Sequence, residues 1–343
     1  MRLIKNKLLL ILLFPLTAFS QINFENGDLQ SAFRKAGVLR KPLFIMIHAD
    51  GCPHCEHFLE TFAINSTIGT YYNTTFVNYK LEVNSEDGRA FRQNLELNVM
   101  STPLLTFWQA DSTLLAVYPA GDPQNNETSI MAFAARALDS KANWPAQKQA
   151  FREGYRQPDF LVNLAYLARY TSDENLNIEA MQAYGLLTGA EPPKDDGFMI
   201  LQKVLTDDEH PLFMQILNRR EEYYTRYGRE EVNQALENVI MWSLHSERAE
   251  RFSFSKLKFM QAALKSIGVD ELSIAGRFFM AESGYYFRNS KLQDAIKLLK
   301  DYCQKRETLE QQEADFLKKY YNEHISDPAL YKQVEDILTP ISK

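Results

Sequence analysis

Cysteine is scarce in this chain, which contains only three among its 343 residues. Small secreted domains that depend on disulfides contain many more, so a disulfide-stapled scaffold is excluded. Positive charge is not in excess either, and the formal net charge of −6 argues against a nucleic-acid partner. After residue 20, no apolar run approaches the ~20 residues that a membrane-spanning helix needs. We therefore expect no membrane span once the N-terminus has been removed.

The N-terminus has the pattern of a cleavable signal peptide. A positive region contains Arg2, Lys5 and Lys7. Residues 8–18 are almost wholly apolar, and Ala18-Phe19-Ser20 has the small residues that a signal peptidase requires. The expected mature chain begins at Gln21 and is periplasmic or secreted. Because this position is not cysteine, a lipoprotein anchor is not indicated, and the remaining alternative is an uncleaved membrane anchor.

Residues 21–140 alternate between helix-like and strand-like patterns. Helical spacing of apolar residues predicts helices over residues 28–39, 52–65, 85–97 and 127–138. Short apolar runs predict strands over residues 43–49, 76–83, 103–108 and 114–118. Strands separated by helices are expected to pair in parallel, whereas the last two, joined by a tight turn, should be antiparallel. The expected fold class is α/β, with a mixed four-stranded sheet flanked by helices.

Helical periodicity alone continues from residue 141 to residue 343, and Asn143-Trp144-Pro145 is a plausible boundary. The expected parts are a signal peptide (1–20), an α/β domain (21–140) and an all-helical domain (141–343). Within residues 270–304, three residues fall near positions where a tetratricopeptide repeat has aromatic or small side chains, namely Tyr286, Ala295 and Leu299. One degenerate repeat and an irregular helical array both remain open.

Two of the three cysteines form the motif Cys52-Pro53-His54-Cys55, which follows a predicted buried strand and opens a predicted helix. A helix N-terminus presents unpaired N–H groups and a positive dipole end, which stabilise a thiolate at Cys52. Thiols in such settings have a pKa of about 3.5–7.5, against about 8.5 for free cysteine. Cys55, one turn further along, is placed to resolve a mixed disulfide. His54 can tune the thiolate, and Pro53 has no N–H to lose at this position.

This motif and the order of elements resemble the thioredoxin superfamily of thiol–disulfide oxidoreductases over residues 22–140. Cys52-Pro53-His54-Cys55 and Phe58 match the disulfide oxidant DsbA, whereas Lys41-Pro42 and the segment 101–104 are similar to the reducing C-terminal domain of DsbD. The resemblance implies that Pro103 is preceded by a cis peptide bond and lies beside the cysteines. It also implies that Thr102 offers backbone groups to an extended substrate peptide.

Two departures from the thioredoxin pattern concern the surroundings of the cysteines. Gly51 replaces the tryptophan that precedes the first cysteine, and Met46 replaces the buried acid of the preceding strand. Glu56 stands where thioredoxin has a lysine. Since the buried acid helps to deprotonate the resolving cysteine, we expect resolution at Cys55 to be slower or assisted differently.

Other interpretations of the polar residues are less well supported. Cys52, His54, Cys55 and His57 are metal-ligand types, but structural zinc needs four ligands, usually from two separated pairs, and no second Cys/His cluster exists. We therefore expect no metal and no organic cofactor. Cys303 is interpreted as a small apolar residue on a packed helix face.

The leading hypothesis is an enzyme that exchanges disulfides with exported protein substrates and with a redox partner protein. In it Cys52 is the nucleophile, Cys55 the resolving thiol, His54 and Pro53 the tuning residues, and Thr102 with Pro103 the substrate-binding residues. The direction stays open, because the motif favours an oxidant and its surroundings favour a reductase or isomerase. The alternative is a helical binding or chaperone-like module for exported proteins, with the α/β domain as its docking platform.

Overall fold

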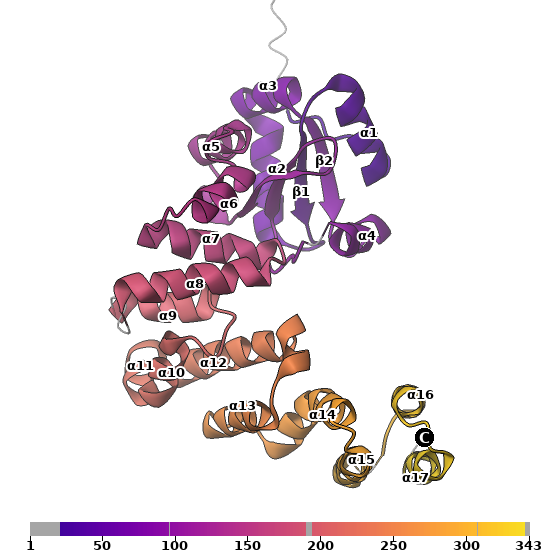
Figure 1. Ribbon diagram of the computed structural model, residues 1–343. Coiled ribbons are helices and arrows are strands. Elements are labelled where there is room, and N and C mark those ends of the chain that lie inside the picture. Colours follow the sequence, from indigo (N-terminus) through magenta and orange to yellow (C-terminus); the bar gives the residue numbers. More distant parts are fainter. Residues whose placement is uncertain (1–20, 96, 190–193, 307, 340–343) are drawn as a thin grey trace, which may run out of the picture. The chain divides into compact units, whose positions relative to one another are not determined.

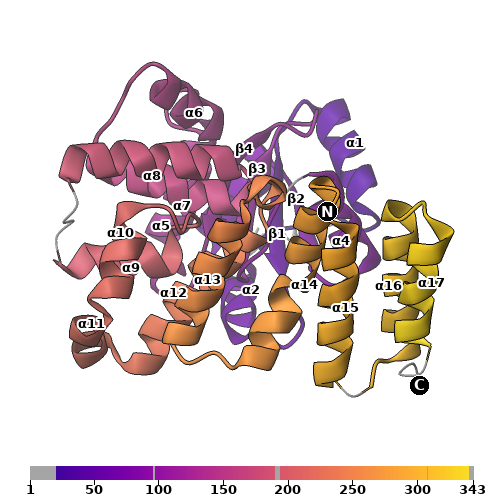
Figure 2. The same cartoon turned by 60° about the horizontal axis from the view of Figure 1, so that its bottom comes forward.

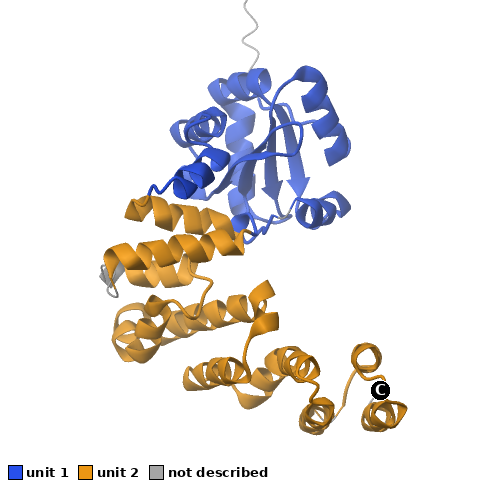
Figure 3. Cartoon of the chain, in the orientation of Figure 1, with its two compact units in different colours: residues 1–155, 170–172 blue, residues 156–169, 173–343 orange. Residues whose placement is uncertain are grey.

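The computed structural model describes residues 21–95, 97–189, 194–306 and 308–339, so the signal peptide expected over residues 1–20 lies outside the described residues. The contacts divide the chain into two compact units (Figure 3). Unit 1 comprises residues up to 155 together with 170–172, and unit 2 comprises residues 156–169 and 173–343. In the described part of the chain, no helix is both long and apolar enough to cross a membrane.

Unit 1 is built on a mixed sheet of four strands (Figure 1). The strands are β1 (Leu43–His48), β2 (Val77–Glu82), β3 (Leu104–Trp108) and β4 (Leu114–Pro119), and their order in the sheet is β2-β1-β3-β4. β1 pairs with β2 in parallel and with β3 antiparallel, and β3 pairs antiparallel with β4. The mixed four-stranded sheet expected from the sequence is confirmed.

Helices cover both faces of this sheet. They are α1 (Leu29–Leu39), α2 (Pro53–Ile64), α3 (Ser66–Thr75), α4 (Glu86–Asn94), the 3-10 helix η1 (Asp122–Gln124), α5 (Glu127–Leu138) and α6 (Trp144–Arg152). Phe44 and Phe107 point to one face and pack with residues of α2, α3 and α5. On the other face, Trp108 makes edge-on ring contacts with Phe33 of α1 and Phe91 of α4. Alternating side chains along each strand thus supply two cores.

The expected parallel pairing of β3 is wrong. Leu104 at the start of β3 lies opposite Ile47, near the end of β1, so the chain enters β3 at the edge where β1 and β2 end. The short helix α4 stays at that edge: a Cβ on Gly88 would clash with the carbonyl oxygen of Glu82, at the end of β2. Because α4 does not return the chain to the opposite edge of the sheet, β3 must run antiparallel to β1.

Helix α3 was not predicted. Asn65 ends α2 and also caps α3, since its side-chain oxygen accepts a hydrogen bond from the Ile68 N–H at 3.0 Å. Ile68 and Tyr72, one turn apart, are buried in the core, and the Tyr72 hydroxyl donates to the Ile130 carbonyl at 2.9 Å. Tertiary packing thus sets the conformation of a segment rich in poor helix formers.

The boundary between the units lies beyond Asn143-Trp144-Pro145. Helix α6 begins at Trp144 and packs with β4, so the contacts assign it to unit 1. The N-cap is Asn143, whose side chain accepts a hydrogen bond from the Ala146 N–H at 3.1 Å. The three residues named as a plausible boundary are therefore the capped start of a helix, with proline at a position where no N–H is needed.

The regular secondary structure in the described residues of unit 2 is all helical. It contains α7 (Pro158–Tyr170), α8 (Glu174–Thr188), α9 (Lys194–Lys203), α10 (Pro211–Asn218), α11 (Arg220–Tyr227), α12 (Arg229–Leu244), the 3-10 helix η2 (Glu247–Arg251), α13 (Phe254–Ser266), α14 (Glu271–Arg288), α15 (Leu292–Arg306), α16 (Gln311–His324) and α17 (Pro328–Leu338). Figure 2 shows α13, α14 and α15 side by side. In the segment compared with a tetratricopeptide repeat, α14 and α15 form a packed pair, with Ala295 and Leu299 buried.

Candidate redox site

The cysteine pair lies where β1 passes into α2. The apolar strand ends at His48, and Gly51 adopts φ +70°, a left-handed conformation that glycine accepts readily. The Cys52 N–H then donates to the Ala49 carbonyl at 3.3 Å. Cys52 is the N-cap of α2 and Pro53 its first helical residue. A buried strand, a glycine turn and a proline at the first helical position together place Cys52 at the start of the helix.

Cys52 and Cys55 form a disulfide, with their Cα atoms 5.3 Å apart. The two sulfurs differ in access, because Cys52 is half-buried whereas Cys55 is only 2% exposed and belongs to the core under α2. The Cys55 backbone N–H points at the Cys52 Sγ, at 3.2 Å. An N–H that donates to sulfur at a helix N-terminus is the arrangement that stabilises a thiolate after reduction.

Thr102 and Pro103 lie beside the pair, and the peptide bond that joins them is cis, as the resemblance implied. The Thr102 hydroxyl donates toward the Cys52 Sγ at 3.4 Å, and the Thr102 carbonyl oxygen lies 3.6 Å from the same sulfur. Pro103 itself is buried. The structure thus brings together Cys52, Cys55, Thr102 and Pro103 from two segments that are far apart in the sequence.

The core around the cysteines contains no buried acid in the described part of unit 1. Met46 is fully buried in the same core as Cys55, at the position where thioredoxins have an acid. The buried polar residues of unit 1 are Asn78, Thr106 and Gln147, none of which titrates in the physiological range. Among the described residues of unit 1, no aspartate or glutamate is buried as a whole residue to assist deprotonation of Cys55.

Next to the cysteines, two histidines share one carboxylate. His54 Nδ1 lies 2.9 Å from Asp122 Oδ2, and His57 Nδ1 lies 3.2 Å from Asp122 Oδ1. The hydrogen bonds from His54 and then His57 hold the pKa of Asp122 below its usual range. Sequence reasoning missed Asp122, because it follows His54 by 68 positions and no local pattern links them.

The third cysteine lies in unit 2 and is a buried core residue, as interpreted from the sequence. Cys303 is 4% exposed, among the apolar side chains packed between α14 and α17. Burial raises the pKa of its thiol to about 11. At neutral pH this thiol is protonated and out of reach of a substrate disulfide.

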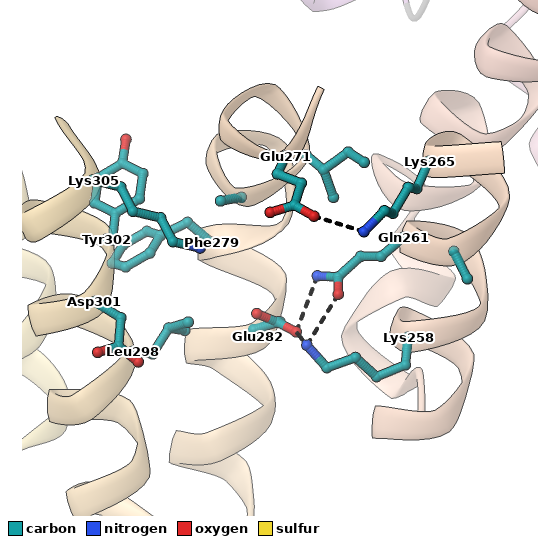
Figure 4. Close-up of a pocket in the computed structure, with 13 residues that line it drawn as sticks. Lys258, Gln261, Lys265, Glu271, Phe279, Glu282, Leu298, Asp301, Tyr302 and Lys305 are labelled. Carbon is teal, nitrogen blue, oxygen red and sulfur yellow. Dashed lines mark hydrogen bonds and ion pairs between the residues drawn. The ribbon is translucent and has the colours of Figure 1, made fainter. Parts of the chain in front are cut away.

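Unit 2 also contains a pocket of about 380 Å³ formed by α13, α14 and α15 (Figure 4). Its charged side chains are largely paired with one another. Glu282, which is buried, accepts hydrogen bonds from Lys258 at 2.5 Å and Gln261 at 3.0 Å. Lys265 and Glu271 form a second ion pair at 2.6 Å. This internal pairing indicates no particular ligand.

Comparison with known proteins yields partial structural matches only. No protein-family model matches the chain, and no curated protein matches it. A protein from Bacteroides thetaiotaomicron proposed to be a disulphide isomerase is 19% identical, with a TM-score of 0.31, covering 35% of this chain and 96% of that one. A protein described as DsbH oxidoreductase is 17% identical, with a TM-score of 0.30, covering 37% of this chain and 93% of that one.

Proposed function

We propose that this chain is a thioredoxin-like thiol–disulfide oxidoreductase that exchanges disulfides with exported protein substrates. The observation that carries the proposal is the Cys52–Cys55 disulfide, which joins a half-buried N-cap sulfur to a buried one. A disulfide between residues only three positions apart closes too short a loop to stabilise a fold substantially. Its position at the start of a helix suits redox cycling instead.

In the reducing direction, the Cys52 thiolate attacks one sulfur of a substrate disulfide. A mixed disulfide forms, and the other substrate sulfur leaves as a thiolate. The Cys55 thiolate then attacks the Cys52 Sγ, which restores the intramolecular disulfide and releases the second substrate thiolate. The substrate gains two electrons and, in water, two protons, and the enzyme loses them. A redox partner protein must reduce the enzyme again for the next turnover.

The residues around Cys52 have supporting roles in this proposal. The Cys55 N–H and the Thr102 hydroxyl are directed at the Cys52 Sγ, so both stabilise negative charge on that sulfur. The backbone of Thr102, next to Pro103, orients an extended substrate peptide across the site. His54 and Pro53 lie within the motif and tune the thiolate.

The direction of exchange depends on the reduction potential of the pair. Groups that stabilise the Cys52 thiolate favour the reduced enzyme and make the disulfide more oxidising. We propose a reductase or isomerase. A potential near that of thioredoxin, about −270 mV, would support a reductant, whereas DsbA, an oxidant, lies at about −120 mV. Equilibration with glutathione redox buffers measures this value, and a result near the DsbA potential would make the enzyme an oxidant.

The central experiment is reduction of insulin disulfides with dithiothreitol as the electron source. The wild-type chain should accelerate insulin precipitation, and Cys52→Ser should abolish the acceleration. Cys303→Ser is the matched control, since it also replaces a cysteine but lies in the core of unit 2. The enzymatic proposal fails if the wild-type chain shows no acceleration, or if Cys52→Ser retains it.

Substrates can be identified with a variant in which the reaction stops at the mixed disulfide. In Cys55→Ser, the mixed disulfide between Cys52 and its substrate has no resolving thiol and should accumulate. Non-reducing electrophoresis after expression with the native N-terminus should show adducts that dithiothreitol removes. Exported proteins among the trapped species would support the proposed substrate class, and only cytoplasmic proteins would contradict it.

A further inference from the structure

His54, His57 and Asp122 form a compact group of metal-ligand types on the surface of unit 1. The two histidines lie one turn apart at the start of α2, and Asp122 opens the 3-10 helix η1. One potential ligand atom from each residue lies within 4.8 Å of the other two. We propose that this group binds a divalent transition-metal ion through two imidazole nitrogens and one carboxylate oxygen.

The spacing of the three side chains is close to what coordination requires. Zinc binds imidazole nitrogen at about 2.0–2.1 Å and carboxylate oxygen at about 2.0–2.2 Å, which places neighbouring tetrahedral ligands about 3.3–3.5 Å apart. Here His54 Nδ1 lies 2.9 Å from Asp122 Oδ2 and His57 Nδ1 lies 3.2 Å from the other oxygen, Oδ1. One ligand atom from each of the three residues lies within 4.8 Å of the other two. Small side-chain adjustments would exchange two hydrogen bonds for metal–ligand bonds.

The donor types select the class of ion. Imidazole suits zinc, copper, nickel and iron, whereas magnesium and calcium prefer sites made of oxygen ligands alone. The side chains of His54, His57 and Asp122 are 55%, 54% and 49% exposed. Solvent can therefore reach the ion and supply its remaining ligand. With three exposed protein ligands, the site should bind less tightly than a closed four-ligand zinc site.

The sequence did not predict this site, because no second Cys/His cluster accompanies His54 and His57 in it. The third ligand is an aspartate from a different element, brought next to α2 only by the fold. The site also does not need the cysteine thiolates, since Cys52 and Cys55 are joined to each other here. The proposed metal site therefore shares His54 with the proposed exchange site but does not require exchange activity.

Isothermal titration of the oxidised full-length chain with zinc chloride tests the site, because the disulfide removes Cys52 and Cys55 as thiolate ligands. We expect one zinc ion per chain with micromolar affinity, and at least tenfold weaker binding for Asp122→Asn and for His57→Ala. His324→Ala is the matched control, since it removes an exposed histidine of unit 2 and should leave the affinity unchanged. With cobalt as the probe, visible absorption bands that Asp122→Asn abolishes would show direct ligation.

Three results would overturn the proposal: no zinc binding by the oxidised chain, unchanged affinity in Asp122→Asn and His57→Ala, or an equal loss in His324→Ala. Asp122→Asn keeps the shape of an exposed side chain, so it remains informative if His57→Ala disturbs α2. The double variant Cys52→Ser/Cys55→Ser cannot exchange disulfides but should bind zinc normally. These experiments therefore distinguish failure of the proposed metal site from failure of the proposed enzymatic activity.

Discussion

The hydroxyl of Thr102 lies 3.4 Å from the sulfur of Cys52, although 50 positions separate the two residues in the sequence. The hydroxyl donates toward the sulfur, so this contact becomes stronger when the sulfur is an anion. A hydrogen bond to a charged group contributes about 1.5–3 kcal/mol. The relationship therefore couples the loop before β3 to the reactivity of the first cysteine.

Replacing this hydroxyl should slow disulfide exchange without unfolding unit 1. Thr102→Val keeps the branched shape but removes the donor, and we expect the insulin-reduction rate to fall by about tenfold, equivalent to about 1.4 kcal/mol. Ser101→Ala is the control, because the Ser101 hydroxyl contacts the Tyr170 hydroxyl at 3.2 Å instead of the sulfur. Equal rates for Thr102→Val and the wild type would show that the hydroxyl does not assist the thiolate.

The three cysteines should differ in their reactivity toward iodoacetamide after reduction. Cys52 is half-buried and should be alkylated first, whereas Cys55, only 2% exposed, should react much more slowly. Cys303 should remain unmodified in the native chain, because burial raises the pKa of its thiol to about 11. Timed quenching and peptide mass spectrometry measure the order, with guanidinium-unfolded chain as the control in which all three react. Modification of Cys303 in the native chain at the rate of Cys52 would contradict the buried position.

Local sequence patterns predicted most of unit 1, because the relevant signals lie within a few residues of each element. The apolar run of β1, the glycine turn and the Cys-Pro pair were sufficient to place Cys52 at the start of α2. Helical spacing also accounts for the buried face of α7 in unit 2, where Leu161, Leu164 and Ala168 are all buried. In each case, periodicity determines which side chains are buried.

The features that were missed depend on contacts between distant segments. Helix α3 has a weak local signal, and its Ile68 and Tyr72 are fixed by packing against the rest of the core. The direction of β3 depends on where the chain leaves α4. The approach of Asp122 to His54 depends on the whole sheet between them. None of these relationships has a signature in a window of ten or twenty residues.

A buried histidine in unit 2 should make the stability of that unit depend on pH. His210 Nε2 lies 3.1 Å from the Met181 carbonyl oxygen, while its Nδ1 accepts a hydrogen bond from the Leu212 N–H. Burial lowers the pKa of His210, against a smaller opposing effect of the Met181 hydrogen bond and the Asp207 charge. The unfolded chain, with its ordinary histidine pKa near 6.5, therefore binds this proton more readily than the folded chain does.

The stability contributed by neutral His210 is fully present above pH 6.5 and is lost as the pH falls through the lowered folded-state pKa. Urea unfolding at pH 7.5 and at lower pH values should show this loss. His210→Asn keeps a side-chain acceptor and a donor but does not titrate. The slope of its unfolding free energy against pH should therefore be smaller than that of the wild type, by an amount equivalent to at most one proton. The exposed His245 provides the control variant His245→Asn, which should keep the wild-type slope. Identical slopes for His210→Asn and the wild type would refute the assignment.

A buried ion pair provides the last prediction, which concerns the stability of unit 2. The Asp208 side chain is fully buried, accepts a hydrogen bond from the Ser243 hydroxyl at 2.6 Å and pairs with Lys256 Nζ at 2.7 Å. Among the ion-pair partners of the mostly buried Lys256 in the described residues, Asp208→Ala would leave the exposed Glu209 carboxylate, at 3.1 Å. Removing one partner of a buried pair costs about 3–5 kcal/mol, and the remaining carboxylate favours the lower end of that range.

The matched control is Asp336→Ala, which breaks the exposed pair between Asp336 and Lys332 on α17. Solvent screens that pair, so its loss should not shift the urea midpoint measurably. Circular dichroism during urea unfolding should show a clear loss of helix at lower denaturant for Asp208→Ala alone. If both variants unfold like the wild type, Asp208 and Lys256 are solvated in solution and the pair contributes nothing to the fold. The double variant Asp208→Ala/Lys256→Met removes both charges. If it regains most of the stability lost in Asp208→Ala, that loss came from burying the unpaired charge of Lys256.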